Sequence, residues 1–205
     1  GGRGTVEHRE VHNAYGALQA AATFEGLLAR TEGRERPFLL SRAFFVGSQR
    51  HGAVWTGDNS ASWEHLRLAV SMVLTLSLSG LPFAGADVGG FFGDPSAELL
   101  VRWYQCGAYY PFFRGHAHLD AARREPFLLP QPHAAAAIEA LRERQRLLPY
   151  WSTLWHERAE EEDHAGAPLI APSWLHFSPT VGEAEAVARA RLREEEQWML
   201  GEALL

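Results

Sequence analysis

Short apolar runs alternate with longer helical patterns along this chain. The runs at residues 38–40, 53–55 and 81–86 each end in polar or glycine residues, and a last run at 168–175 precedes Ser178 and Pro179. Apolar runs of this length, bounded by turn residues, are typical of buried β-strands. We therefore predict four short strands between Phe38 and Leu175.

The segments between these strands carry helical patterns. Apolar residues recur at helical spacing over about 11–30 and 63–78, and two further helices begin near Asp94-Pro95 and Pro132. Asp94 is expected to cap its helix, with Pro95 in the first turn. Pro149 should kink the last of these helices, which ends at the acidic run 160–163. An exposed helix is predicted over 183–197.

The alternation of strands and helices predicts a parallel α/β architecture. Arg42, Asp58 and Asp87 follow three of the strands. Because the carboxyl ends of parallel strands meet at one edge, we expect these side chains at the edge where (β/α)-barrels keep their catalytic groups. A complete barrel takes about 250 residues and eight strand–helix units. The chain has 205 residues and about four such units, so we expect part of a barrel.

The composition and the net charge of the chain exclude several classes of protein. The chain is 46% hydrophobic and holds 7 Trp, 11 Phe and 5 Tyr, which indicates a folded globular protein. A net charge of −6 without a basic patch argues against nucleic-acid binding. Polar residues, among them Arg67, interrupt the most apolar stretch, which favours a buried helix over a membrane span. The single cysteine, Cys106, excludes an internal disulfide framework and a multi-cysteine zinc site.

Asp58 is the first candidate for chemistry. It stands in the run Trp55-Thr56-Gly57-Asp58-Asn59 at a predicted strand end. A carboxyl beside a tryptophan can lose solvation, which raises its pKa and suits a general acid. Alternatively, Asp58 or Asn59 caps the helix that follows. Arg42 either orients this carboxylate and binds a substrate hydroxyl or forms a structural ion pair.

The glycine-rich run at 85–92 and the histidines beyond it are further candidates. Its glycines let the backbone approach a ligand closely around Asp87, although Asp87 is equally read as a turn residue. Phe91 and Phe92 form either a sugar platform or part of the core. His116 either hydrogen-bonds a polar substrate or is a structural histidine. No third ligand stands at a recognisable spacing, so no metal is expected.

Several of these motifs together resemble the catalytic domain of glycoside hydrolase family 31. The matching segments are residues 41–50, 55–59, 85–92, 102–105 and 110–116, in the family's order and spacing. The resemblance covers nearly the whole chain, over residues 5–180 and 196–205. Residues 7–13 and 123–126 are similar to the branch of neutral α-glucosidases of the glucosidase II type.

The resemblance implies the C-terminal half of a (β/α)₈ TIM barrel and a retaining α-glucosidase that removes terminal non-reducing glucose from glycans. Asp58 matches the family's general acid/base. The residues that match its sugar-binding positions are Arg42, Trp55, Asp87, Phe91 and His116. The resemblance further implies an oligosaccharide or N-glycan substrate, a regulatory beta subunit as partner, the lumen of the endoplasmic reticulum as location, and no cofactor.

The chain also departs from the family pattern. The family's nucleophile lies in a Trp-x-Asp-Met-Asn-Glu motif, which this sequence does not contain. Because retaining hydrolysis needs two carboxylates about 5–5.5 Å apart, the alternative is an inactive fragment with at most weak sugar binding. The start at Gly1 without Met suggests a longer parent. We expect residues 1–180 to form the later half of the barrel, and 181–205 to be an altered or inserted helical segment.

Overall fold

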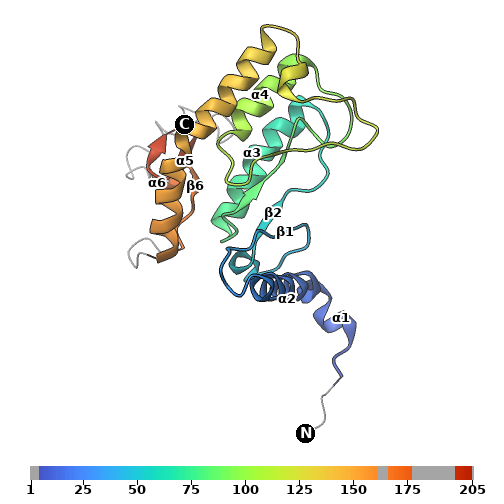
Figure 1. The fold of residues 1–205 in the computed structure, drawn as a ribbon, viewed down its shortest axis with the longest axis vertical. Coiled ribbons are helices and arrows are strands. Elements are labelled where there is room, and N and C mark those ends of the chain that lie inside the picture. Colours follow the sequence, from blue (N-terminus) through green and yellow to red (C-terminus); the bar gives the residue numbers. More distant parts are fainter. Residues whose placement is uncertain (1–4, 161–165, 177–196, 205) are drawn as a thin grey trace, which may run out of the picture.

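The computed structural model describes residues 5–160, 166–176 and 197–204 (Figure 1). Its helices are α1 (His8–Val11), α2 (Tyr15–Arg30), α3 (Trp63–Leu78), α4 (Ala97–Gly107), α5 (His133–Glu160) and α6 (Ser173–His176), with 3₁₀ turns η1 (His12–Ala14), η2 (Ser48–Arg50) and η3 (Pro126–Leu128). Its strands are β1 (Leu40–Ser41), β2 (Ala53–Trp55), β3 (Ala84–Gly85), β4 (Asp87–Val88), β5 (Arg114–Gly115), β6 (Ile170–Pro172), β7 (Trp198–Leu200) and β8 (Ala203–Leu204).

Two parallel sheets and one antiparallel sheet make up the described strands. The first sheet has the order β1-β2-β3, and the second pairs β4 with β5. Helices α3 and α4 lie in the connections between these parallel strands, in agreement with the predicted α/β alternation. The antiparallel sheet β6-β7-β8 was not predicted. It is joined to α3 by the hydroxyl of Ser77, which donates to the carbonyl of Ile170 at 2.7 Å.

The long helix and the second strand are confirmed, and two predicted strands are too long. The first strand, predicted over 38–40, lies instead at Leu40–Ser41. α3 and β2 have the predicted bounds. The run at 81–86 contains only the two-residue strand β3, and Asp87 then begins β4 instead of following a strand. Ala86 separates the two strands, because β3 continues the first sheet while β4 pairs with β5. At 168–175 the strand is limited to β6, because the chain turns into α6 from Ser173.

Helix α4 begins later than the sequence suggests. Its cap is Ser96, whose hydroxyl accepts a hydrogen bond from the amide of Leu99 at 3.2 Å. The carboxylate of Asp94 instead accepts from the amide of Ala122 at 2.8 Å, so the predicted cap is wrong. Pro149 lies inside α5, whose axis changes direction along its length (Figure 1). Most of the predicted helix at 183–197 lies outside the described residues.

The core fixes the parallel strands against the helices. Val54 of β2 and Ala84 of β3 pack with Val73 and Leu74 of α3, and all four side chains are at most 3% exposed. The turn from α4 towards β5 is held by the half-buried guanidinium of Arg144, which donates to the carbonyls of residues 108, 110 and 111 at 3.0, 2.7 and 3.2 Å. In the described part of the chain, no helix is long and apolar enough to cross a membrane.

Candidate active site

The candidate side chains come from adjacent parallel strands. Arg42 follows β1, Asp58 lies three residues beyond β2, and Asp87 is the first residue of β4. His116 follows β5, which pairs with β4. The strand topology therefore brings residues that are up to 74 positions apart to one side of the parallel sheets. Arg42, Asp58 and His116 follow the carboxyl ends of their strands, as expected, whereas Asp87 begins one.

Arg42 and Asp58 form an ion pair at this edge. The Nη1 of Arg42 lies 3.3 Å from Oδ2 of Asp58, and the two side chains are 61% and 29% exposed. Gly57, with φ +87°, makes room for the guanidinium, because a Cβ at that position would lie 3.3 Å from Nη2 of Arg42. The carboxylate is thus held by a cation while it remains open to solvent. The desolvation expected at Asp58 is not what the structure shows.

The alternative reading of Asp58 and Asn59 as helix caps is wrong. Helix α3 begins after Ser62, whose hydroxyl accepts a hydrogen bond from the amide of His65 at 3.2 Å. Asn59 is instead a buried connector. Its side-chain amide donates to the carbonyl of Asp87 at 3.1 Å, and its side-chain oxygen accepts from the amide of Phe91 at 2.9 Å. The sequence suggested only a capping role for Asn59.

Asp87 is the buried carboxylate of the site. Its side chain is 0% exposed, and Oδ1 accepts a hydrogen bond from Nη2 of Arg114 at 2.5 Å. Burial raises the pKa of Asp87, although Arg114 and His116 act in the opposite direction; the charge of Asp58 adds to the increase. The turn alternative holds for its backbone, because the carbonyl of Asp87 accepts from the amide of Gly90 at 3.1 Å, while its side chain is buried in the site.

Arg114 joins two of the predicted site residues, a contact that the sequence does not indicate. Its guanidinium also lies over the ring of Trp55, 5.0 Å from the centroid. The sequence signals for Arg114 are its position two residues before His116 and directly after Phe112 and Phe113.

Phe91 and Phe92 lie against the histidines instead of inside the core. The ring centroids of Phe91 and His116 are 5.3 Å apart, and those of Phe92 and His118 are 5.8 Å apart. The carbonyl of Phe91 accepts from the amide of His118 at 2.9 Å. Together with the bonds from Asn59, this contact joins the loops after β2, β4 and β5 into one unit.

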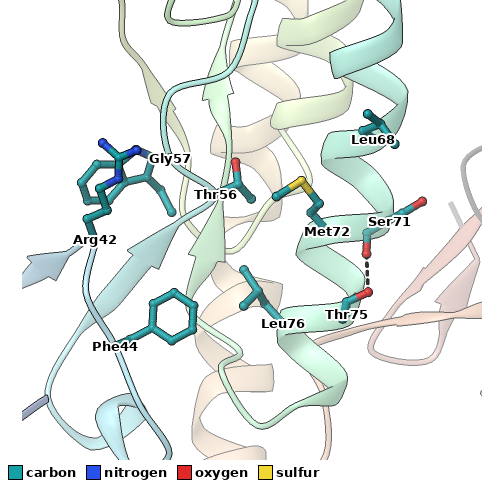
Figure 2. A pocket seen from close by; sticks show the side chains of 10 residues that line it. Arg42, Phe44, Thr56, Gly57, Leu68, Ser71, Met72, Thr75 and Leu76 are labelled. Carbon is teal, nitrogen blue, oxygen red and sulfur yellow. Dashed lines mark hydrogen bonds between the residues drawn. The ribbon is translucent and has the colours of Figure 1, made fainter. Parts of the chain in front are cut away.

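A cavity of about 450 Å³ lies beside this unit, between the first two strands and α3 (Figure 2). Its lining comprises Arg42, Phe44, Trp55, Thr56, Gly57, Leu68, Ser71, Met72, Thr75 and Leu76. Figure 2 shows the α3 side chains Leu68, Met72 and Leu76 opposite Arg42 and Phe44. Among the predicted site residues, only Arg42 and Trp55 line this cavity. The cavity therefore lies next to Asp58 and Asp87 but does not include them.

Two other chemistries find no support in the described ranges. No group of three His, Cys, Asp or Glu side chains there is placed to hold a metal ion. Burial raises the pKa of the Cys106 thiol to about 11, and its sulfur lies 3.3 Å from the hydroxyl of Tyr110. A thiol with so high a pKa is a poor nucleophile at neutral pH.

Comparisons with known proteins give the family. The TIM-barrel domain of glycosyl hydrolases family 31 matches residues 2–154. Neutral alpha-glucosidase AB of Homo sapiens is 52% identical over 202 residues, which are 98% of this chain and 20% of that protein.

Two solved structures agree with this assignment. The crystal structure of the glucosidase II alpha subunit bound to alpha3-Glc2 has a TM-score of 0.85 and 47% identity, covering 97% of this chain and 20% of that one. The ER glucosidase II heterodimeric complex contains the catalytic subunit and the binding domain of the regulatory subunit. It matches with a TM-score of 0.83 and 48% identity, covering 95% of this chain and 20% of that one. The chain therefore spans about a fifth of the length of these relatives. It belongs to glycoside hydrolase family 31 and contains part of that family's TIM-barrel domain.

Proposed function

We propose that this chain supplies the acid/base and sugar-binding part of a retaining α-glucosidase that removes terminal non-reducing glucose from glycans. The observation that carries the proposal is the Arg42–Asp58 pair at the strand ends, beside the unit built around Asp87. Family membership and the names of the α-glucosidase relatives support the reaction class.

Asp58 is the group proposed to move the proton. As the glycosidic bond breaks, its carboxyl protonates the leaving oxygen; as the carboxylate, it then takes a proton from the attacking water. Its partial exposure suits this role, because the leaving sugar and the incoming water both need access. Arg42 is proposed to orient Asp58 and to donate to a sugar hydroxyl with its remaining N–H groups.

The remaining residues are proposed to form the glucose pocket. Trp55 and Phe91 supply aromatic faces, and His116 supplies a ring nitrogen for a hydroxyl. Arg114 occupies Oδ1 of Asp87, and Oδ2 has no hydrogen-bond partner among the described residues. We propose that a sugar hydroxyl donates a hydrogen bond to this buried oxygen.

The proposed place in the parent protein follows from the same residues. Residues 1–180 are proposed to be the C-terminal half of the barrel, and 181–205 a segment that leads to its end. The five parallel strands between Leu40 and Gly115 support this arrangement. An N-glycan substrate, a regulatory beta subunit as partner and the lumen of the endoplasmic reticulum as location are proposed with it. The solved complex of ER glucosidase II, which contains a catalytic subunit and the binding domain of a regulatory subunit, supports the partner and the location.

Activity of a chimera tests the function. Residues 5–172 replace the matching segment of the glucosidase II alpha subunit, to which this chain is 47% identical. We expect hydrolysis of an α-linked glucose disaccharide, with α-glucose as the first product seen by NMR because the mechanism is retaining. A folded chimera that is inactive, or that first releases β-glucose, would contradict the proposal.

The second candidate, an inactive fragment, concerns the 205-residue chain by itself. Asp87 is a poor substitute for the family's nucleophile, because it is buried and bonded to Arg114. We therefore expect no turnover of 4-nitrophenyl α-glucoside by the purified chain. Turnover that Asp58→Asn abolishes would refute this expectation and reveal another carboxylate acting as nucleophile.

A further inference from the structure

The loop of residues 89–93, called the glycine loop below, carries Phe91 between three glycines. Gly89, Gly90 and Gly93 have φ values of +94°, +82° and +80°. L-residues with side chains rarely adopt this region, and glycines gain much conformational freedom when a loop is released. The position of Phe91 therefore depends on contacts that fix the loop from outside.

One face of the glycine loop is fixed by the loop after β2. The carbonyl of Asn59 accepts from the amides of Phe91 and Phe92 at 2.8 and 2.9 Å. Gly90 packs so closely there that a Cβ on it would lie 2.4 Å from the amide nitrogen of Ala61. These contacts hold the middle of the loop and leave the carbonyls at its ends to other donors.

Those carbonyls are bound by one guanidinium, that of Arg124. Its Nη1 donates to the carbonyls of Gly89 and Gly90 at 3.0 and 2.8 Å, and its Nη2 donates to the carbonyl of Gly93 at 2.6 Å. Nη2 also lies 3.4 Å from the carboxylate of Asp94, directly after the loop. The Arg124 side chain is only 12% exposed, which makes these charge-assisted bonds stronger than they would be in water.

We propose that Arg124 is the positioning residue of the sugar pocket, which holds the glycine loop so that the ring of Phe91 stays against His116. The site function of Phe91 rests on the proposed glucosidase function, whereas the clamp on the loop does not. Arg124 touches no substrate in this role; it acts through Phe91. Only a planar fork with several donors spans three carbonyls at once, so lysine is not an equivalent replacement.

The neighbouring Arg123 provides a matched control. Its side chain is 72% exposed and pairs with Glu125 at 2.7 Å, two residues away. Arg123→Ala therefore removes the same charge and side chain from the adjacent position without touching the glycine loop. Arg124→Ala and Arg124→Lys are the test variants.

Amide hydrogen exchange and NMR on the 205-residue chain test whether Arg124 holds the glycine loop in place. In Arg124→Ala we expect exchange at the amides of Phe91 and Phe92 to rise by about tenfold or more, and the ring-current shift of the His116 protons to disappear. Arg123→Ala should leave both unchanged, and guanidinium ion added to Arg124→Ala should restore both in part. If Arg124→Ala shows the same amide exchange rates and the same His116 shifts as the wild type, the proposal is overturned.

Two further measurements separate the loss of the clamp from a loss of folding and from a failure of the proposed glucosidase function. Amides of α3, which Arg124 does not contact, report whether a variant is folded; if Arg124→Ala loses that protection, Arg124→Lys replaces it. A folded Arg124→Lys that matches the wild type at Phe91 would also overturn the clamp. In the active chimera, Arg124→Lys should raise KM for the disaccharide with kcat nearly retained. An inactive wild-type chimera refutes the glucosidase function alone, because the exchange experiment does not depend on it.

Discussion

Asp58 and Asp87 are the two carboxylates of the candidate site, and they lie in opposite environments. Asp58 is partly exposed and pairs with an arginine that is itself mostly in solvent. Asp87 is fully buried, and one of its oxygens is bonded to Arg114. This difference matches the proposed roles, because a proton donor needs access to the leaving group while an orienting acceptor needs a fixed place. Neither environment follows from the sequence, since the Asp87–Arg114 pair joins residues 27 positions apart.

Stability should depend on pH through Asp87. Burial raises its folded-state pKa above the ordinary 3.8, so between these two values the folded chain binds more protons than the unfolded chain. The free energy of unfolding contributed by this group is therefore fully present below the ordinary pKa and is lost as pH rises through the raised value. Asp87→Asn should remove this slope.

Urea unfolding of the chain and of Asp87→Asn, between about pH 4 and pH 7, measures the effect as the difference between the two curves. The stability of the wild type relative to the variant should fall with rising pH. A relative stability that is constant, or that rises with pH, would contradict the account. The difference between the two curves cancels the opposite contributions of other carboxylates such as Glu125 and Glu139, whose pKa values are lowered by arginines.

At the scale of elements, the site depends on strands of only two or three residues. Periodicity predicted α3 and β2, because their apolar patterns are long or sharply bounded. It did not predict the break between β3 and β4. That break reflects the close approach of the chain after α4: a Cβ on Gly85 would lie 1.9 Å from the carbonyl oxygen of Phe112. A tertiary contact of this kind leaves no periodic signal in the sequence.

Gly85→Ala should therefore destabilise the fold. The added methyl group must push the backbone of Phe112 away from β3, and overpacking of this kind costs about 1–3 kcal/mol. Gly26→Ala in α2 is the control: a Cβ there meets nothing within 4 Å, and alanine favours the helix by about 0.5–1 kcal/mol. Thermal or urea unfolding gives both values. A Gly85→Ala chain as stable as the wild type would show that this approach does not constrain the strands.

At the scale of the whole molecule, the chain holds part of a catalytic barrel. Its described residues include five parallel strands, whereas a complete barrel of this class has eight. The sequence predicted this parallel part and the edge that carries Arg42 and Asp58, because polar residues follow each apolar run. It predicted neither the antiparallel sheet at the end of the chain nor the two arginines that fix the site, Arg114 and Arg124. Their partners lie 27 to 35 positions away along the sequence.

The central claim is that Asp58 delivers the proton, and leaving-group dependence in the chimera tests it most directly. Asp58→Asn should lower kcat/KM on an α-linked glucose disaccharide by about 100- to 10,000-fold. On α-glucosyl fluoride, whose leaving group needs no proton, the fall should be far smaller, and Asp120→Asn, which changes an exposed carboxylate, should affect neither substrate. Equal losses on both substrates, or no loss on the disaccharide, would contradict the assignment of Asp58 as general acid/base.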